Sequence, residues 1–504
     1  MEKEYYLFIL VAASAVGKSV LVNQLCEEGA WQKAKKYSTR DNRGEDDDVI
    51  KIDDNSITNT PDEQKQTEIR LSRMNKLINL CGEGKGVVYY KNDNIYGVSI
   101  SEIKEGLKKS HLAVIISDFH AIDKLREQLD CVKVMYIAST IDEKLLFERF
   151  KEREQDKYQS ELKQMTGIIN SIQDKVMILP SAIRLKYASK IDEIIRNVND
   201  KWNTNLSSYQ TIKTRSFNIR MLYNRYIDNI TKIDYAILNF YGLEYMYKQV
   251  RNIIANIHPK KATKQIPPVF MVCAASSSGK ATLMEIIGDM GAVHNNIVIT
   301  KKYAKRDPRP TDGRDGMQAI GKSGNFEDHI EKEHIWQWQF HKRDNTKGIE
   351  YAVNHKEIRD NINNSKAQIF ISNMGEIENA RLYYPNNIVV LYLHATHETE
   401  TTKHIEAKRR HEIELEIKNS HTDYTDEMIK SEFENNEKTQ NKLKTKIEED
   451  KKEIKEVHDT FCEHNVNIDH ILLNTGTRED LIEQMTNLIN YYTNNTIYSE
   501  INLK

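Results

Sequence analysis

The chain has few cysteines, few prolines and no long apolar run. Among its 504 residues are 5 cysteines and 8 prolines. The cysteines are scattered, odd in number and without zinc-ligand spacing, so neither a disulfide framework nor a zinc site is expected. The first apolar run, residues 7–13, is too short to span a bilayer, and the glutamates before it do not resemble a signal peptide. These absences favour a cytoplasmic protein with no membrane segment.

An excess of charge of one sign is also missing. The 73 Lys and Arg residues nearly balance the 75 Asp and Glu residues, so no net field favours nucleic acid or an anionic membrane as a partner. The length exceeds what one hydrophobic core usually serves, so two domains of about 230 to 250 residues each are expected.

A short segment occurs twice. Residues 35–43 (KKYSTRDNR) and residues 301–309 (KKYAKRDPR) agree at six of nine positions. Each copy follows a glycine-lysine pair by a similar distance. A repeat with the same internal order of motifs predicts two copies of one domain.

Residues 257–268 separate the two copies. This segment holds three of the eight prolines, has no apolar period and precedes a new apolar run. We therefore predict a linker there, with domains at 1–256 and 269–504. On each side an apolar strand, a glycine-lysine turn and alternating helices and strands follow in the same order, which predicts an α/β fold with a mostly parallel sheet in each half. The other matching blocks are residues 112–118 with 367–373, 132–137 with 388–393, and 233–239 with 468–474.

Each half carries a long polar segment that we predict to be helical, residues 154–215 in the first and 410–460 in the second. An exposed helical hairpin is the simpler expectation for each, and a coiled coil that makes a homodimer is the alternative. The second segment has an amphipathic pattern, formed by Leu443, Ile447, Ile454, Val457 and Phe461.

Residues 12–19 (AASAVGKS) have the form of a phosphate loop between a strand and a helix. In such a loop, backbone N–H groups and the helix N-terminus face the β-phosphate, the lysine bridges β- and γ-phosphate oxygens, and the hydroxyl holds magnesium. This predicts ATP and Mg²⁺ as cofactors of the first half. The residues expected to bind them are Ala13, Ser14, Ala15, Val16, Gly17, Lys18 and Ser19.

The second loop keeps Gly279 and Lys280 but has Ala281 where the magnesium hydroxyl should stand. Thr282 comes one residue late, and one residue on a helix turns a side chain by about 100°. The second loop is therefore predicted to be degenerate.

The order of residues after the first loop is that of guanylate kinases: Thr39-Arg40 and Arg43-Gly44-Glu45, then Tyr96-Gly97, then Asp118 at a strand end, then two arginines on a helix. The chain resembles that superfamily over most of both halves. The resemblance implies phosphoryl transfer from ATP to a small phosphorylated acceptor, a nucleoside monophosphate or similar. It assigns acceptor binding to Arg40, Arg43 and Tyr96, and the magnesium site to Ser19 and Asp118. Arg149, Arg153 and Arg220 would be catalytic residues of the lid, the segment that closes over the transferred phosphoryl group. Asn239 would lie beside the nucleotide.

Two departures concern the acceptor. Lys36 stands where the family has a hydroxyl residue that contacts guanine, and no glutamate precedes Tyr96-Gly97. Guanine specificity is therefore not expected. The segment from Trp338 to His341, with Tyr351, is similar to ribosyl bisphosphate kinases, so a ribosyl phosphate is an alternative acceptor; otherwise the tryptophans pack on a strand.

The second half has lost three groups that serve one chemical step. It lacks the magnesium hydroxyl, and Asn373 is matched to Asp118. No arginine occurs between Arg410 and Arg478, and Lys455 is the residue matched to Arg220 when positions are counted back from the last matching block. A regulatory or structural half is therefore predicted. The competing interpretation is that the whole chain is a non-catalytic nucleotide sensor or scaffold. The residues still expected to hold a phosphorylated ligand there are Gly279, Lys280, Arg306, Arg309 and Tyr351.

Overall fold

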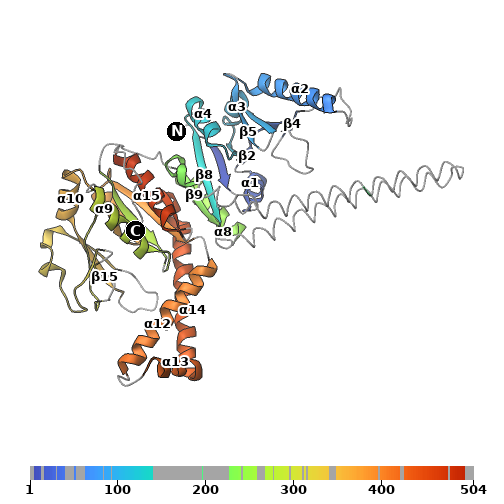
Figure 1. The fold of residues 1–504 in the computed structure, drawn as a ribbon. Helices are drawn as coiled ribbons and strands as arrows, with labels where there is room; N and C mark the ends of the chain where they lie inside the picture. The colour runs from blue at the N-terminus through green and yellow to red at the C-terminus, as the bar shows by residue number, and fades with distance from the viewer. Residues whose placement is uncertain are drawn as a thin grey trace, which may run out of the picture. The chain divides into compact units, whose positions relative to one another are not determined.

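A computed structural model shows that the chain is an α/β protein (Figure 1). All structural statements below concern the residues that it describes. These are residues 5–12, 16–29, 31–39, 50–52, 63–82, 84–91, 94–139, 196, 226–239, 242–257, 267–275, 277–294, 297–308, 312–313, 316–339, 348–395, 398–420, 425–474 and 477–493.

The first half contains a five-stranded parallel sheet in the order β2-β7-β1-β8-β9. The central strand has the sequence LFILVA and is buried along its whole length, as expected for a parallel strand covered on both faces. The residue that follows it therefore lies in the middle of the carboxyl edge, where such sheets bind ligands. The strands are β1 (Leu7–Ala12), β2 (Trp31–Lys33), β7 (His111–Ile115), β8 (Val132–Ser139) and β9 (Tyr235–Asn239), and the helices beside them are α1 (Lys18–Glu27), α3 (Ile100–Gly106), α4 (Phe119–Gln128), the short η1 (Ile230–Lys232) and α8 (Leu243–Ala255).

The second half repeats this sheet in the order β11-β16-β10-β17-β18. The prediction of an α/β fold with mostly parallel sheets is therefore confirmed. The strands are β10 (Val269–Ala274), β11 (Ile297–Ile299), β16 (Ala367–Ile371), β17 (Ile388–Ala395) and β18 (His470–Asn474), and the helices beside them are α9 (Lys280–His294), α10 (His355–Asn363), η4 (Met374–Glu376), α11 (Ile377–Tyr383), η5 (Asn465–Asn467) and α15 (Arg478–Thr493).

The strand register corrects one match between the halves. Leu7 pairs with Leu112 in the first sheet, and its counterpart Val269 pairs with Gln368 in the second. Leu112 therefore corresponds to Gln368, and the match of residues 112–118 with 367–373 was wrong by one position. The cause is a turn that is one residue shorter after β16, which the linear comparison could not detect.

Each half also has a four-stranded sheet beside the large one, in the orders β4-β3-β6-β5 and β13-β12-β15-β14. The repeated Lys-Tyr residues, Lys36-Tyr37 and Lys302-Tyr303, lie in the matching strands β3 and β12, which are antiparallel to β6 and β15. The repeat therefore marks the same structural position twice. The strands are β3 (Lys36–Ser38), β4 (Ile50–Lys51), β5 (Gly86–Lys91), β6 (Asn94–Ser99), β12 (Lys302–Ala304), β13 (Met317–Ala319), β14 (Ile335–Gln339) and β15 (Glu350–Asn354), and the helices are α2 (Glu63–Cys81), η2 (Phe326–Asp328) and η3 (Lys332–His334).

The second polar segment forms three helices instead of a hairpin: α12 (Glu398–Ser420), α13 (Asp426–Asn435) and α14 (Glu437–His464). They pack on one another, with Ile405, Ile413 and Phe433 buried between them. A homodimer through these helices stays a prediction. Except for Arg196, the first polar segment lies outside the described residues.

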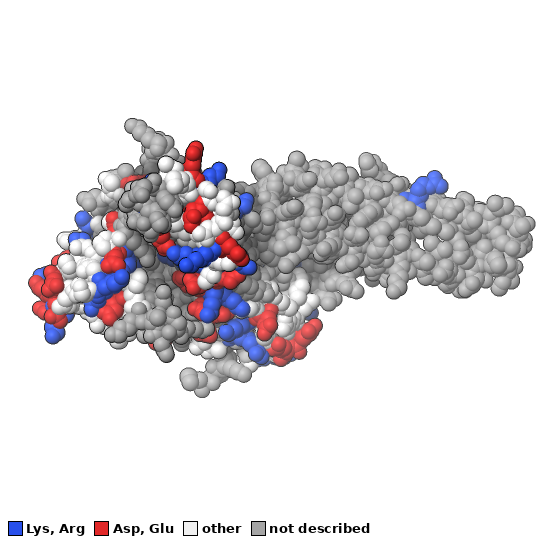
Figure 2. Space-filling view, turned by 90° about the horizontal axis from the view of Figure 1, so that it is seen from below, with Lys and Arg blue, Asp and Glu red and all other residues white. Residues whose placement is uncertain are grey.

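Both sheets belong to one compact unit, which spans Met1–Ala12, Gly17–Thr140 and Tyr226–Lys504. The predicted domain boundaries stay a prediction, since most of the linker lies outside the described residues. In the part of the chain that the structure describes, no helix is long and apolar enough to cross a membrane. Figure 2 shows positive and negative side chains interspersed among the described residues of one face.

Candidate phosphate-binding sites

The first phosphate loop leaves the carboxyl end of the central strand β1. Gly17 has φ of 95° and caps α1, a left-handed conformation that a glycine adopts without strain. The ammonium of Lys18 lies back against the strand, with Nζ 2.9 Å from the carbonyl oxygen of Ala12. The lysine and the N-terminus of α1 therefore both lie at the end of β1. Val16 is buried and Ser19 is exposed in the first turn of the helix, while Ala13, Ser14 and Ala15 lie outside the described residues.

The second loop has the same backbone form. Gly279 has φ of 100°, and Lys280 Nζ lies 3.1 Å from the carbonyl oxygen of Ala274 and 2.6 Å from that of Ala275. Asn474, at the end of β18, donates from Nδ2 to the carbonyl oxygen of Ser278 at 2.9 Å. A side chain on Gly279 would meet that amide at 2.3 Å. Only a glycine fits at this point of the second loop.

Each large sheet ends its last strand with an asparagine. Asn239, predicted to lie beside the nucleotide, is buried and accepts a hydrogen bond from Gly242 N at 3.1 Å, which closes the turn before α8. Its counterpart Asn474 donates to the second phosphate loop. A place for Asn239 beside the nucleotide stays a prediction.

Asp118 follows β7, the neighbour of β1, and is half-buried. The register pairs Leu10 with Ile115, so Asp118 and the phosphate loop leave the same edge of the sheet. Its Oδ1 accepts a hydrogen bond from Ala121 N at 2.8 Å and caps α4. In the second half the register places Met374 at this position, and the helix-capping residue is Asn373. Whether the halves are matched by strand register or by the helix-capping residue, the second half has no carboxylate at this position.

The small sheets carry a duplicated lysine-tyrosine pair. Lys36 is buried and donates from Nζ to the carbonyl oxygen of Ile115 at 3.1 Å, and the same atom lies 5.9 Å from the ring centre of Tyr96. Lys302 is buried in the same way, 2.9 Å from the carbonyl oxygen of Ile371 and 4.9 Å from the ring centre of Tyr351. Each lysine therefore joins the small sheet to the end of a large-sheet strand, beside the predicted acceptor tyrosine.

Sequence reasoning treated Lys36 only as a departure from a family pattern and did not predict this role. The signal was present in the chain, because both lysines belong to the repeated segment. A second pair of residues is also repeated, ten positions after the last matching block of each half. Gln249 and Gln484 each bond the backbone N–H and C=O of a leucine in the last strand and donate to a carbonyl oxygen in their own helix. These hydrogen bonds are 2.8 to 3.1 Å long.

The predicted phosphate-binding arginine of the second half is already paired. Arg306 is buried and donates to both oxygens of Asp312, at 2.9 and 2.5 Å. A bidentate arginine-carboxylate pair occupies the donors that would otherwise bind a phosphate. The interpretation that Arg306 still holds a phosphorylated ligand is therefore not supported by its contacts.

The arginine aligned with Arg153 is also paired. Arg409 donates from Nε to Asp450 at 2.6 Å and from Nη2 at 2.5 Å, and Asp450 is buried between α12 and α14. Beside the second loop, His394 lies at the end of β17, where the first half has alanine. Burial lowers the pKa of His394 to about 3, so this imidazole adds no positive charge near neutral pH.

The tryptophans of the second half pack in the small sheet. Trp336 and Trp338 are 2% and 5% exposed. Trp338 stacks on Tyr351 with ring centres 6.1 Å apart, and Tyr89 stacks on Tyr96 in the matching position at 5.5 Å. The packing interpretation of these tryptophans accounts for their contacts.

Several predicted site residues lie outside the described residues. They are Arg40, Arg43, Arg149, Arg153, Arg220 and Arg309.

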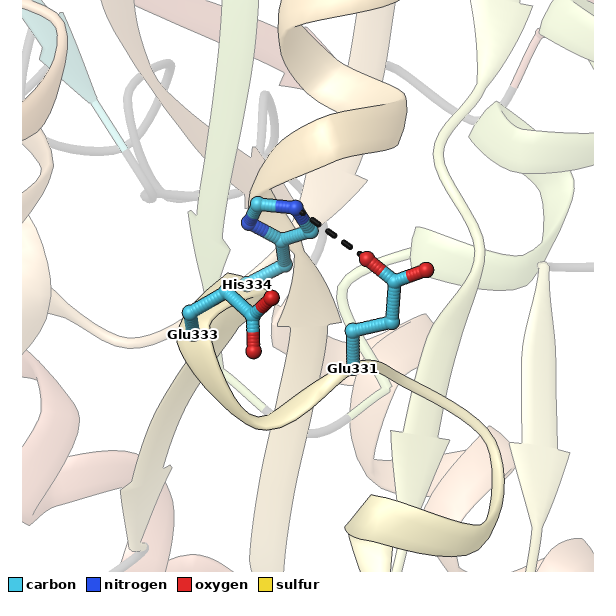
Figure 3. Close-up of side chains that lie close together, drawn as sticks. All are labelled: Glu331, Glu333 and His334. Carbon is cyan, nitrogen blue, oxygen red and sulfur yellow. Dashed lines mark ion pairs between the residues drawn. The ribbon is translucent and has the colours of Figure 1, made fainter.

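One cluster of metal-ligating side chains was not predicted. The ligand atoms of Glu331, Glu333 and His334 lie within 4.8 Å of one another (Figure 3). Positive side chains already contact this cluster: Lys356 Nζ is 3.7 Å from Glu331, and Arg359 Nη2 is 3.2 Å from His334 Nδ1. Because cations compete for the same atoms, we assign no metal to it.

No protein-family model matches the chain, and no curated protein matches it in sequence. Among solved structures, it is similar to a guanylate kinase from Anaplasma phagocytophilum, with 15% identity and a TM-score of 0.26, over 51% of this chain and 87% of that chain. A TM-score of this size supports no functional conclusion, so the function has to be inferred from the residues of the chain itself.

Proposed function

We propose that the first half transfers a phosphoryl group from ATP to a small phosphorylated acceptor, such as a nucleoside monophosphate, and that the second half does not. The observation that carries the proposal is the arrangement at the carboxyl edge of the first sheet. Gly17 shapes the loop, Lys18 lies at the end of β1, and Asp118 leaves the adjacent strand at the same edge.

The donor set of this edge fits a nucleotide and its magnesium ion. The N-terminus of α1 and the Lys18 ammonium offer positive charge to phosphate oxygens. Ser19 and Asp118 offer the hard oxygen ligands that Mg²⁺ prefers. When bound, the ion would supply charge neutralisation. The chain's own contribution is to position the phosphates and to exclude water.

The acceptor is proposed to bind beside the small sheet. Tyr96 is half-buried there and stacks on Tyr89, with the Lys36 ammonium next to its ring. Arg40 and Arg43 follow this sheet in sequence and are proposed to hold the acceptor phosphate. Arg149, Arg153 and Arg220 are proposed to stabilise the transferring group, since phosphoryl transfer depends on positioned positive charge.

The second half supports a non-catalytic role through its own contacts. Ala281 supplies no hydroxyl, and Arg306 and Arg409 are each bound by a carboxylate. A fully non-catalytic sensor or scaffold is the competing function, and the first half distinguishes the two because its loop keeps both Lys18 and Ser19.

The test is ATP consumption by the full chain with magnesium and a panel of nucleoside monophosphates, deoxynucleotides and ribosyl phosphates. Lys18→Ala should lower kcat/KM for the accepted substrate by about 10²- to 10³-fold. Lys280→Ala is the matched control and should change it less than about twofold. ATP binding without turnover for every acceptor would instead support the sensor or scaffold.

A further inference from the structure

The surfaces that join the two halves are related to each other residue by residue. Asn252 in α8 donates to the carbonyl oxygens of Glu463 at 2.7 Å and Cys462 at 3.5 Å, and Asn487 in α15 donates to the carbonyl oxygen of Ile227 at 3.2 Å. Asn252 and Asn487 stand at the same position after the matching strands β9 and β18, and Ile227 and Cys462 stand at the same position before them. Each half therefore gives the other the same contact.

The aromatic residues at this interface repeat in the same way. Tyr226 packs on Tyr136 of β8 with ring centres 4.3 Å apart, and Phe461 packs on Tyr392 of β17 with ring centres 4.5 Å apart. All are nearly completely buried. Tyr226 additionally donates its hydroxyl to the carbonyl oxygen of Ile471 in β18. The phenylalanine has no hydroxyl with which to make a reciprocal bond.

Charged residues at the rim also occupy matched positions. Lys248 in α8 lies 3.6 Å from Glu463, whereas Glu483 in α15 shares a hydrogen bond with Asp228. Contact of the same patch with itself is the property of an isologous interface, the kind that two-fold symmetric dimers use.

We infer that the surface of the first half around Tyr226, Asn252 and η1 binds a domain of this same fold, and that the second half occupies it as a fused partner subunit. The second half is therefore held by the interface and not only by the linker. This assignment does not depend on phosphoryl transfer.

The experiment keeps the full chain. A protease recognition sequence replaces residues 261–265 in the linker, the protein is purified folded, and the chain is then cleaved. We expect the two fragments to elute together at the mass of the uncut protein in size-exclusion chromatography at micromolar concentration. Separation of the cleaved wild-type fragments would overturn the inference.

A paired variant tests the particular contact. Asn252→Asp with Asn487→Asp keeps the side-chain shape but replaces each amide donor with a carboxylate that faces carbonyl oxygens. The dissociation constant of the cleaved fragments should rise at least tenfold. The control, Asn435→Asp with Asn441→Asp, adds the same charge at exposed positions of α13 and α14 and should leave it unchanged. Equal dissociation constants for the two variants would contradict the assignment.

A measurement on the uncut chain guards against misfolding of the fragments. A carbodiimide joins amines to nearby carboxylates, so it should link Lys248 to Glu463 in the wild type. Mass spectrometry should find this cross-link reduced at least fivefold in Asn252→Asp with Asn487→Asp. Absence of the cross-link in the folded wild type would also overturn the inference.

Discussion

The two phosphate loops have nearly the same backbone and different chemical surroundings. Gly17 and Gly279 adopt φ of 95° and 100°. Lys18 and Lys280 each donate to the carbonyl oxygen of the last residue of the central strand, Ala12 or Ala274. Around them, however, one half keeps a serine and an aspartate, while the other has an alanine and buried arginine-carboxylate pairs. Loop shape follows from packing between strand and helix, so it persists after the chemical groups are gone. A phosphate-loop fold is therefore no proof of phosphate chemistry.

The largest effect is expected at the buried ion pair between Asp450 and Arg409, the arginine aligned with Arg153. Asp450→Asn leaves the Arg409 guanidinium without its carboxylate in a site where Asp450 is 2% exposed. Removing one partner of a buried ion pair costs about 3–5 kcal/mol. Urea unfolding should show this loss. The control Glu416→Gln disturbs an exposed pair with Lys446 and should cost less than about 1 kcal/mol. Equal costs would mean that Arg409 is not committed to Asp450.

The next comparison exchanges the magnesium hydroxyl, and it rests on the proposed activity. Ser19→Ala should lower kcat/KM by about 10²-fold, because one group that organises the phosphates is lost. Ala281→Ser should create no new activity, since Arg306 remains bound to Asp312. Initial velocities across a magnesium series measure both. Turnover by Ala281→Ser in a Lys18→Ala background would show that the second half lacks only a hydroxyl.

The repeated glutamines should behave alike. Gln249→Leu and Gln484→Leu each leave a buried backbone N–H and C=O without the partner shown here, which costs about 1–3 kcal/mol per unsatisfied group. Denaturant midpoints compare the two. Gln128→Leu, at an exposed position, should change stability by less than about 0.5 kcal/mol. A marked difference between Gln249→Leu and Gln484→Leu would break the equivalence of the halves.

The smallest effect concerns the acidic pair between the halves. Partial desolvation of the carboxyl and its hydrogen bond to Asp228 raise the pKa of Glu483 above its usual 4.5. The folded state therefore holds a proton that the unfolded state has released, so this stabilisation is present below pH 4.5 and is lost as pH rises through the folded pKa. Glu483→Gln should match wild type at pH 4 and exceed it at pH 7, by less than about 1 kcal/mol because the pair is exposed.

A second variant sharpens that test. Glu483→Lys places a cation where the matching position of the first half has Lys248, and it should form an ion pair with Asp228. Its stability relative to wild type should rise from pH 4 to pH 7, because the wild type loses the stabilisation from its protonated Glu483 over this range. Thermal unfolding at the two pH values measures the change. A fall in relative stability over this range would show that Asp228 does not face this side chain.

Sequence patterns predicted the large sheets because their strands are apolar on both faces. The small sheets were not predicted, although the repeated segment lies in them. The register of β16 was missed because the match relied on a shared Ile-Ser pair, while a turn had lost one residue. The three helices of the second insertion had cap signals in Thr425 and Asn436, whose side chains accept hydrogen bonds from Met428 N and Lys438 N. A helical hairpin was predicted instead, because no proline or glycine interrupts the segment.

The site residues were predictable where backbone and motif coincide, as at Gly17 and Lys18. The pairing of Arg306 with Asp312 was not, because no motif links the two residues and only the folded structure brings them together. An arginine at a motif position cannot bind a phosphate while a carboxylate occupies its guanidinium donors.

The reciprocal contacts of Asn252 and Asn487 carry a consequence for how such a protein changes over time. In a homodimer every substitution appears twice, so a residue that helps one subunit burdens the other. Joining the copies in one chain removes this constraint. Lys248 could differ from Glu483, and Tyr226 from Phe461, without any second site having to tolerate the change. Fusion thus lets one member of a symmetric pair specialise while the other is retained for its shape.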